Sequence, residues 1–329
     1  MSVIGNVATL MDFAKRSDPN GKIQKIIELL AKENPILKDM LWMEGNLPTG
    51  HLTTVRTGLP SVTWRMLNYG VQPSKSTTKQ VTDHCAMLEA YAEVDKKLAQ
   101  INNNTAAWRL GEDMAFLEAM NQAMADVLFY GDETSPEKFV GLTPRYAELT
   151  GVDSAANVIS ALGDSSNKQT SLWFVTWDQL ATHGIFPKGS TAGFKHEDLG
   201  EVTLDDGAGG HFQGFRSHYQ WDCGLTVRDW RRNVRICNID TTKLGTSNAA
   251  KLFDYLTMAY HKINRYSGRK VIYCNSTVAT YLDLQAQVKT NVYLTQGQMD
   301  GEPVTTYRGI PIRVCDAIKD TEAVVTKEG

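Results

Sequence analysis

The sequence predicts an α+β fold, and three observations support this prediction. A polar stretch at 46–86 is rich in strand-forming residues, and a long amphipathic pattern at about 105–130 predicts a helix. Short apolar runs typical of buried strands follow at 171–177 and 271–274. At 329 residues, the chain is long enough to bury a substantial core in two lobes.

The first 45 residues predict an amino-terminal arm. After a turn at 18–21, the next apolar residues follow helical spacing, and Pro35 ends this helix near Asn34. A second short amphipathic piece follows at 36–42. Helices this short gain most of their stability by packing an apolar face, so we expect the arm to dock on a larger surface.

Residues 46–86 predict an extended β-hairpin with a basic surface. The 38 residues from Gly45 to Thr82 contain no acidic side chain. Their four basic residues are Arg56, Arg65, Lys75 and Lys79. Strand-forming stretches alternate with turn signals, the strands at 51–57, 61–67 and 76–82 and the turns at 58–60 and 68–70. A lone polar hairpin is barely stable in water, so this one needs a surface to lie on, and a basic hairpin prefers an acidic surface.

The pattern at about 105–130 predicts the longest helix of the chain. One apolar face runs from Leu110 to Leu128, and Gly131 follows the end of the helix. About 25 residues at roughly 1.5 Å each give a rod of nearly 40 Å. We expect this rod to be the backbone of a lobe at 87–170, in which residues 90–101 are also predicted to be helical.

A second lobe is expected at 171–300, and closing strands at 301–329. Glycine, acidic residues and turn signals at 184–214 predict an irregular insertion. Residues 225–239 alternate in part and predict one long strand or two. The arginines at 231, 232 and 235 are expected to form ion pairs between strands or between subunits.

No combination of residues predicts a catalytic, cofactor or metal site. The five cysteines are scattered, and the histidines lack zinc-ligand spacing. The glycine-rich stretch at 207–214 is not placed between a strand and a helix, as a phosphate-binding loop would be. The acidic residues at 196–206 match no calcium loop and are more typical of a solvated or subunit-facing patch.

The overall charge and hydropathy exclude two further classes. A formal net charge of −3 argues against a dedicated nucleic-acid-binding protein. No apolar run reaches the roughly 18 residues of a membrane span, and the amino terminus lacks the basic region of a secretion signal.

Several local sequences, in the predicted order of elements, are similar to those of one protein family. The stretches that carry this similarity are 58–65 (GLPSVTWR), 129–131 (FYG), 139–145 (FVGLTPR), 187–190 (PKGS), 196–200 (HEDLG), 229–231 (DWR), 238–240 (NID) and 307–312 (YRGIPI). The chain resembles the major capsid protein of tailed bacteriophages with the Hong Kong 97-type fold, and a podovirus-like major head protein subfamily in particular.

This resemblance implies a role for each segment. Residues 1–45 would be the N-arm, 46–86 the E-loop, 87–170 the P-domain with its spine helix, and 171–300 the A-domain. The protein would assemble as hexamers and pentamers into an icosahedral shell around double-stranded DNA. Its other partners would be a scaffold, a portal and a cement or decoration protein, and assembly would take place in the cytoplasm of the host bacterium.

The basic hairpin and the resemblance together predict that the E-loop of one subunit lies on an acidic surface of its neighbour. The receiving residues are expected near the two ends of the spine helix, with the 197–206 patch as a second choice. The candidate interface residues are Arg56, Trp64, Arg65, Lys75, Lys79, Glu112, Asp113, Glu133 and Glu137, with Asp132 among the receivers.

Two other functions remain open from the sequence. The chain could be a soluble α+β enzyme whose hairpin packs on its own body, with a site in the 184–214 insertion. It could also be the shell of a bacterial nanocompartment of the same fold, which would enclose a cargo enzyme.

Overall fold

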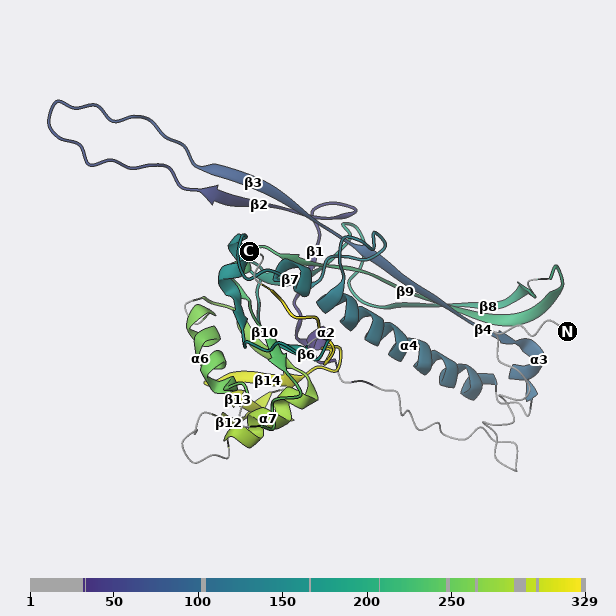
Figure 1. The fold of residues 1–329 in the computed structure, drawn as a ribbon. Helices are drawn as coiled ribbons and strands as arrows, with labels where there is room; N and C mark the ends of the chain where they lie inside the picture. Colours follow the sequence, from purple (N-terminus) through teal and green to yellow (C-terminus); the bar gives the residue numbers. More distant parts are fainter. Residues whose placement is uncertain are drawn as a thin grey trace.

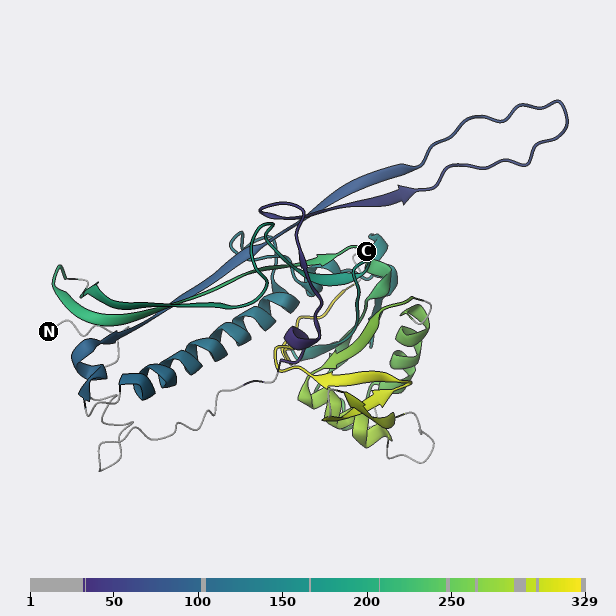
Figure 2. The ribbon, with the colours of Figure 1, turned by 180° about the vertical axis from the view of Figure 1, so that it is seen from behind.

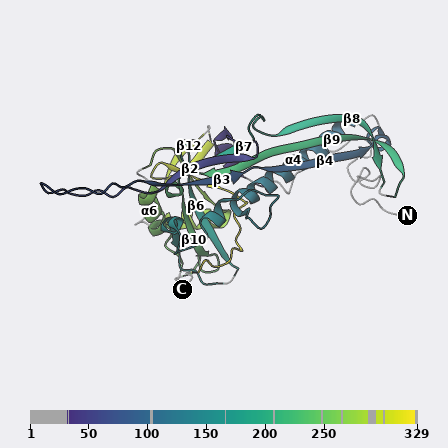
Figure 3. The same ribbon diagram turned by 90° about the horizontal axis from the view of Figure 1, so that it is seen from above.

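A protruding hairpin, an elongated lobe and a compact lobe make up the chain (Figure 1). The computed structural model describes residues 32, 34–101, 105–165, 167–206, 208–246, 249–263, 266–286, 294–299 and 302–326. The hairpin and the elongated lobe extend to opposite sides of the compact lobe, as the views from behind and from above also show (Figures 2 and 3).

The hairpin consists of β2 (Gly50–Gly58) and β3 (Thr77–His84), which pair antiparallel along their whole length. Residues 59–76 connect the two strands as a long open tip. The strand expected at 61–67 is therefore absent, because this part of the tip has no neighbouring strand to satisfy its backbone hydrogen-bonding groups.

A sheet and one long helix build the elongated lobe. Its strands are β4 (Ala86–Asp95), β8 (Lys195–Asp205) and β9 (His211–Val227), and its helix is α4 (Thr105–Tyr130). Strand β9 lies between β4 and β8 and pairs antiparallel with both. Helix α4 lies along this sheet, and its bounds agree with the helix predicted at about 105–130 (Figure 1).

The helix predicted at 90–101 is wrong for most of its length, because residues up to Asp95 belong to strand β4. Only α3 (Lys96–Ala99), which is capped by the carboxylate of Asp95, is helical there. Ala92 and Val94 are buried whereas Tyr91 is exposed, which is the period of two of a strand. The alanines and charged residues of this stretch favour a helix locally, but pairing with β9 overrides that preference.

The irregular insertion predicted at 184–214 is wrong, because most of this segment forms regular strands. Residues 182–186 form β7 (Thr182–Phe186), and β8 then forms a regular antiparallel ladder with β9. Eight of the eleven residues of β8 are exposed and only Leu204 is buried, so the strand has too little apolar alternation for a sequence pattern to detect. The glycine-rich segment lies at the turn from β8 to β9, where Asp206 accepts hydrogen bonds from the backbone of Ala208 and Gly210.

The predicted apolar face of α4 is buried over only half of its length. Met120, Met124 and Leu128 are buried, whereas Leu110 and Met114 are about 60% exposed in this subunit, at 62% and 59%.

The compact lobe has a mixed sheet that continues through β7 into β9. The sheet order is β12-β13-β14-β11-β6-β7-β9-β4, with β1 beside β7, β8 beside β9, β10 beside β6 and β5 beside β10. The remaining strands are β1 (Trp42–Glu44), β5 (Val158–Ser160), β6 (Gln169–Trp177), β10 (Val234–Asp240), β11 (Arg269–Cys274), β12 (Leu294–Met299), β13 (Glu302–Tyr307) and β14 (Ile310–Val314). The helices are α2 (Ile36–Asp39), α5 (Leu142–Arg145), α6 (Leu252–Ile263) and α7 (Ser276–Ala286).

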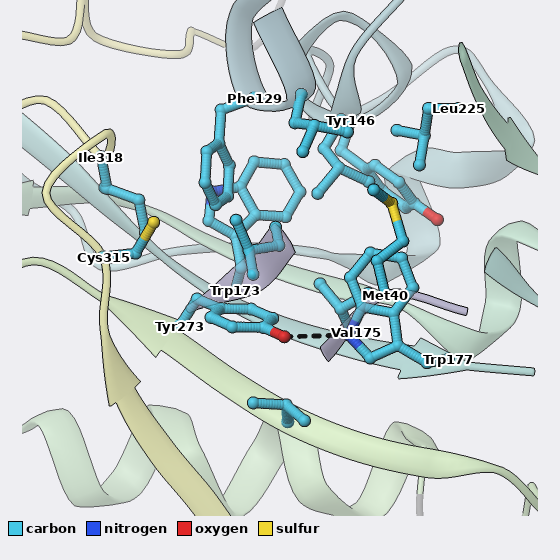
Figure 4. Packing of buried hydrophobic residues seen from close by; sticks show 14 of the residues in the cluster. Met40, Phe129, Tyr146, Trp173, Val175, Trp177, Leu225, Tyr273, Cys315 and Ile318 are labelled. Atoms are coloured by element: carbon cyan, nitrogen blue, oxygen red, sulfur yellow. Dashed lines mark hydrogen bonds between the residues drawn. The ribbon is translucent and has the colours of Figure 1, made fainter. Parts of the chain in front are cut away.

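Strand β6 is the centre of this lobe and is buried at every position. Trp173 and Val175 face one apolar cluster, which also holds the end of α4 (Figure 4). Leu172 and Phe174 face a second cluster under α6 and α7. A strand covered on both faces reads as a continuous apolar run, which is why 171–177 is recognisable in the sequence.

Residues 225–239 resolve into two strands rather than one. A 3₁₀ turn at Trp230–Arg232 separates β9 from β10. The arginines form ion pairs within the described subunit, but that of Arg231 is local to this turn and does not join two strands. Arg231 pairs with Asp229, and Arg235 forms a buried pair with Glu322 at 2.9 Å.

The two lobes are interleaved in the sequence. Strands β8 and β9 of the elongated lobe come from residues expected in the second lobe, and β5 of the compact lobe comes from residues expected in the first. In the described part of the chain, no helix is both long and apolar enough to cross a bilayer.

Candidate assembly interface

The base of the β2–β3 hairpin is held rigidly against the body. The side chain of Asn46 donates to the carbonyl of Leu52 and accepts from its amide, at 2.8 and 2.7 Å. The amide of Cys85 donates to the carbonyl of Thr49 at 2.9 Å. A side chain at Gly50 would meet the carbonyl oxygen of Asp83 at 2.1 Å, so only glycine allows this close approach.

A buried carboxylate fixes the direction of the hairpin. Asp83 on β3 is 5% exposed and pairs with the guanidinium of Arg145 at 2.7 Å. The hydroxyl of Thr226 on β9 also donates to Asp83. Arg145 further donates to the carbonyls of Val140 and Leu225, at 3.2 Å each. Because charged groups bonded in this way hold one geometry, the hairpin leaves the body in a defined direction.

Two buried histidines lie beside this anchor. His51 on β2 and His183 on β7 face each other edge to face, with ring centroids 5.9 Å apart. Their ring nitrogens make no hydrogen bond of ordinary geometry within the described residues. Burial, the neighbouring His51 and Arg228 lower the pKa of His183 to about 4, so its imidazole is neutral at pH 7.

The basic residues of the hairpin are fully available to a partner. Arg56, Arg65, Lys75 and Lys79 are all exposed, and none forms an ion pair with another described residue. The tip is held together by a few contacts only, such as the bond from the hydroxyl of Ser74 to the carbonyl of Ser61 at 2.8 Å.

The tip is also strongly apolar, although the sequence had indicated only its basic residues as a candidate interface along with Trp64. Seven large apolar side chains are exposed between 59 and 71, and Trp64 is 101% exposed. The seven are Leu59, Val62, Trp64, Met66, Leu67, Tyr69 and Val71. Contiguous exposed apolar surface of this kind marks an interaction site.

The expected receiving residues fall into two separate groups. Glu112 and Asp113 lie in the first half of α4, where Asp113 accepts a hydrogen bond from the hydroxyl of Tyr219. Glu133 and Glu137 lie in the loop after α4 and are exposed. Between Asp113 and the end of α4 lie 17 residues of helix, so roughly 25 Å separates the two groups.

The carboxylates of the loop after α4 differ from those of the 197–206 patch in their pairing. Glu133 and Glu137 form no ion pair with another described residue. Asp132 bonds the amide and hydroxyl of Thr134, which lowers its pKa. In the 197–206 patch, Asp198 already pairs with Arg109 at 2.5 Å and Glu201 with Lys96 at 2.6 Å.

The end of the N-arm is tied to its own subunit. Asp39 on α2 is buried and pairs with Arg269 at 2.8 Å and Arg313 at 3.3 Å, and the hydroxyl of Tyr273 donates to it. The amphipathic helix predicted before Pro35 lies outside the described residues. Within those residues, no group of three or more His, Cys, Asp or Glu side chains is arranged to hold a metal ion.

Comparisons with known proteins agree with this architecture. A family model described as major capsid protein GP7 matches residues 18–326. The solved capsid structure of bacteriophage Epsilon15 is similar to the chain, with 35% identity, a TM-score of 0.82 and coverage of 99% of each chain. No match was found among curated proteins.

Two structures of lower identity also match. The bacteriophage JBD30 capsid covers 88% of this chain and 93% of its own at 8% identity, with a TM-score of 0.46. An encapsulin of Synechococcus elongatus PCC 7942 covers 71% and 97% at 9% identity, with a TM-score of 0.45.

The hairpin, the spine helix with its sheet and the compact lobe define a Hong Kong 97-type phage capsid subunit. The chain belongs to the major capsid protein GP7 family. It is the major capsid protein of a bacteriophage, a structural part of the virion.

Proposed function

We propose that the β2–β3 hairpin ties the shell together by lying on the acidic loop at 131–141 of a neighbouring subunit. One observation supports this most: the base of the hairpin is fixed to the body of its own subunit, whereas the side chains of its tip are exposed. The anchor at Asp83 and Arg145 directs the hairpin away from its own body, so its basic and apolar side chains meet only another molecule.

Charge explains the choice of surface. The hairpin presents four exposed basic side chains, and Glu133 and Glu137 are exposed carboxylates without a partner among the described residues. A single exposed ion pair contributes only about 0.2–1 kcal/mol. The same contact repeats around a closed shell, so the total stabilisation becomes large through multivalency.

The proposal includes the remaining partners. Hexamers and pentamers of this subunit form an icosahedral shell around double-stranded DNA, with weak contact to the DNA because the formal net charge is −3. A scaffold during assembly, a portal and a decoration protein complete the particle, which is built in the host cytoplasm. The subunit is structural and carries no catalytic activity, and its N-arm adds contacts to neighbouring subunits.

Charge reversal tests the role of the hairpin. Arg56→Glu with Arg65→Glu places two negative charges against the carboxylates of Glu133 and Glu137, so we expect shell yield to fall at least tenfold by electron microscopy. The matched control, Arg56→Lys with Arg65→Lys, keeps the charge and should assemble normally. Adding Glu133→Lys and Glu137→Lys to the reversed hairpin should restore shells. Normal yield from the reversed hairpin alone would contradict the proposal.

A further inference from the structure

We propose that Trp64 at the hairpin tip is an anchor that fills an apolar cavity at the base of the hairpin of a neighbouring copy. This inference rests on the proposed function and names the contact within it. The cavity has a volume of about 180 Å³ and opens between the start of β4, the helix α4 and the loop that follows α4.

The cavity has the size and chemistry of a seat for one aromatic ring. Met87, Met124, Val127 and Phe139 contribute to its almost entirely apolar lining. An apolar cavity of about 150 Å³ in another protein binds a benzene ring, so a space of this size accommodates an aromatic side chain. Methionine side chains are flexible and adapt to the shape of an inserted group.

The tip offers a matching occupant. Trp64 is the largest of the seven exposed apolar side chains and has no contact that covers it. Tryptophan is enriched among the residues that dominate protein interfaces, because it removes a large apolar area from water in a single pocket.

The tip cannot reach the cavity of its own subunit. Ala86 and Met87 line the cavity and follow directly after β3, so the cavity lies at the base of the hairpin. Eight or nine strand residues at about 3.3 Å each carry the tip some 25–30 Å away from that base. Folding back would break the β2–β3 ladder, and the occupant is therefore a second copy of the chain.

A contact between the tip of one copy and the base of the next is directional. It uses two different surfaces, so it joins subunits head to tail, and such contacts form rings when the rotation between neighbours closes. Rings of subunits are the units that the proposed shell requires.

The charges at the cavity support the same pairing. Glu137 and Lys138 are the two charged residues that line the cavity, and Arg65, which directly follows Trp64, matches the carboxylate of Glu137. A seated Trp64 therefore brings Arg65 within side-chain reach of Glu137, so the apolar and the ionic contacts reinforce each other.

Two variants test the occupant and the seat separately. Trp64→Ala removes the occupant, and Ala123→Trp fills the seat, because Ala123 lines the cavity from the exposed side of α4. We expect each to raise the concentration of unassembled subunit at least tenfold in sedimentation, with the circular dichroism of the free subunit unchanged. The control Ala119→Trp lies one turn earlier, is also exposed and does not line the cavity, so it should assemble like the natural protein.

A crosslink tests the geometry even if a variant folds poorly. In a Cys85→Ser, Cys223→Ala background, which removes the natural thiol that lines the cavity, Trp64→Cys with Ala123→Cys should form disulfides between subunits of assembled shells when diamide is added, seen as a ladder on non-reducing gels. Trp64→Cys with Ala119→Cys should give no ladder. Equal ladders from both pairs, or none from the first pair, would overturn the inference.

The outcomes separate this inference from the proposed function. If charge reversal of the hairpin abolishes shells while Trp64→Ala and Ala123→Trp assemble normally, the hairpin still joins subunits but Trp64 is not its anchor. If the reversed hairpin also assembles normally, both fail.

Discussion

The compact lobe and the hairpin place their large apolar side chains in opposite environments. In the compact lobe, β6 is buried at every position and Trp173 is 0% exposed. In the hairpin, Trp64 is 101% exposed, and the tip contacts little of its own subunit. The lobe is therefore stabilised within one chain, whereas the apolar area of the hairpin is available for burial only on assembly.

Two tryptophans test this contrast most strongly. Trp173→Ala removes a large side chain from the core and should lower the free energy of unfolding of the free subunit by about 3–5 kcal/mol. Trp64→Ala removes the same side chain from an exposed tip and should change it by less than about 0.5 kcal/mol. Urea unfolding of unassembled subunits measures both. Equal losses would show that the tip packs on its own subunit and would remove the contrast.

The charged groups of the two regions differ in the same way. Arg235 and Glu322 are 2.9 Å apart and both buried, and the hydroxyls of Tyr130 and Ser171 also bond Glu322. Glu322→Gln leaves the guanidinium buried without its counter-charge, so we expect a loss of about 3 kcal/mol in urea unfolding.

The matched control for the buried pair is Glu201→Gln, which breaks the exposed pair with Lys96. This change should cost less than about 1 kcal/mol. A small loss from Glu322→Gln would mean that the closing segment is not what holds β10 and the end of α4 together.

The elements that sequence patterns predicted are those whose own residues carry the signal. Helix α4 has an apolar repeat along its length, and β6 is one continuous apolar run. The hairpin is marked by its turn residues and by the lack of acidic side chains. Strand β8 has no such signal because its pairing partner supplies its order through the backbone.

The candidate interface was predicted only in part for the same reason. The four basic residues could be found because charge is visible in the sequence. The anchor could not, because Asp83 and Arg145 are 62 positions apart and their pairing depends on how β3 and α5 pack. The cavity at the hairpin base likewise exists only where β4, α4 and the loop after α4 converge.

The smallest expected effect concerns pH at the boundary between the hairpin and the compact lobe. Burial holds the pKa of His183 at about 4, below its ordinary value of 6.5. The unfolded chain therefore binds a proton more readily, so the contribution of His183 to stability is complete above pH 6.5 and is lost as the pH falls towards 4. Between pH 7 and pH 5 we expect a loss of about 2 kcal/mol, measured by urea unfolding of the free subunit.

The loss of stability between pH 7 and pH 5 can be assigned to a particular residue by considering the groups around His183. Its pKa is affected by His51, Arg228, Asp83 and the backbone of Asp178. The pKa of His51 is also lowered, so His51 adds to the loss in the same direction. The carboxyl of Asp240, with a pKa of about 2, titrates below this window and does not contribute to it. His183→Gln should therefore reduce the loss of stability between pH 7 and pH 5 to the part that His51 contributes, while Asp240→Asn should leave the slope unchanged. An unchanged slope in His183→Gln would mean that the buried imidazole is not the group whose protonation loosens the base of the hairpin.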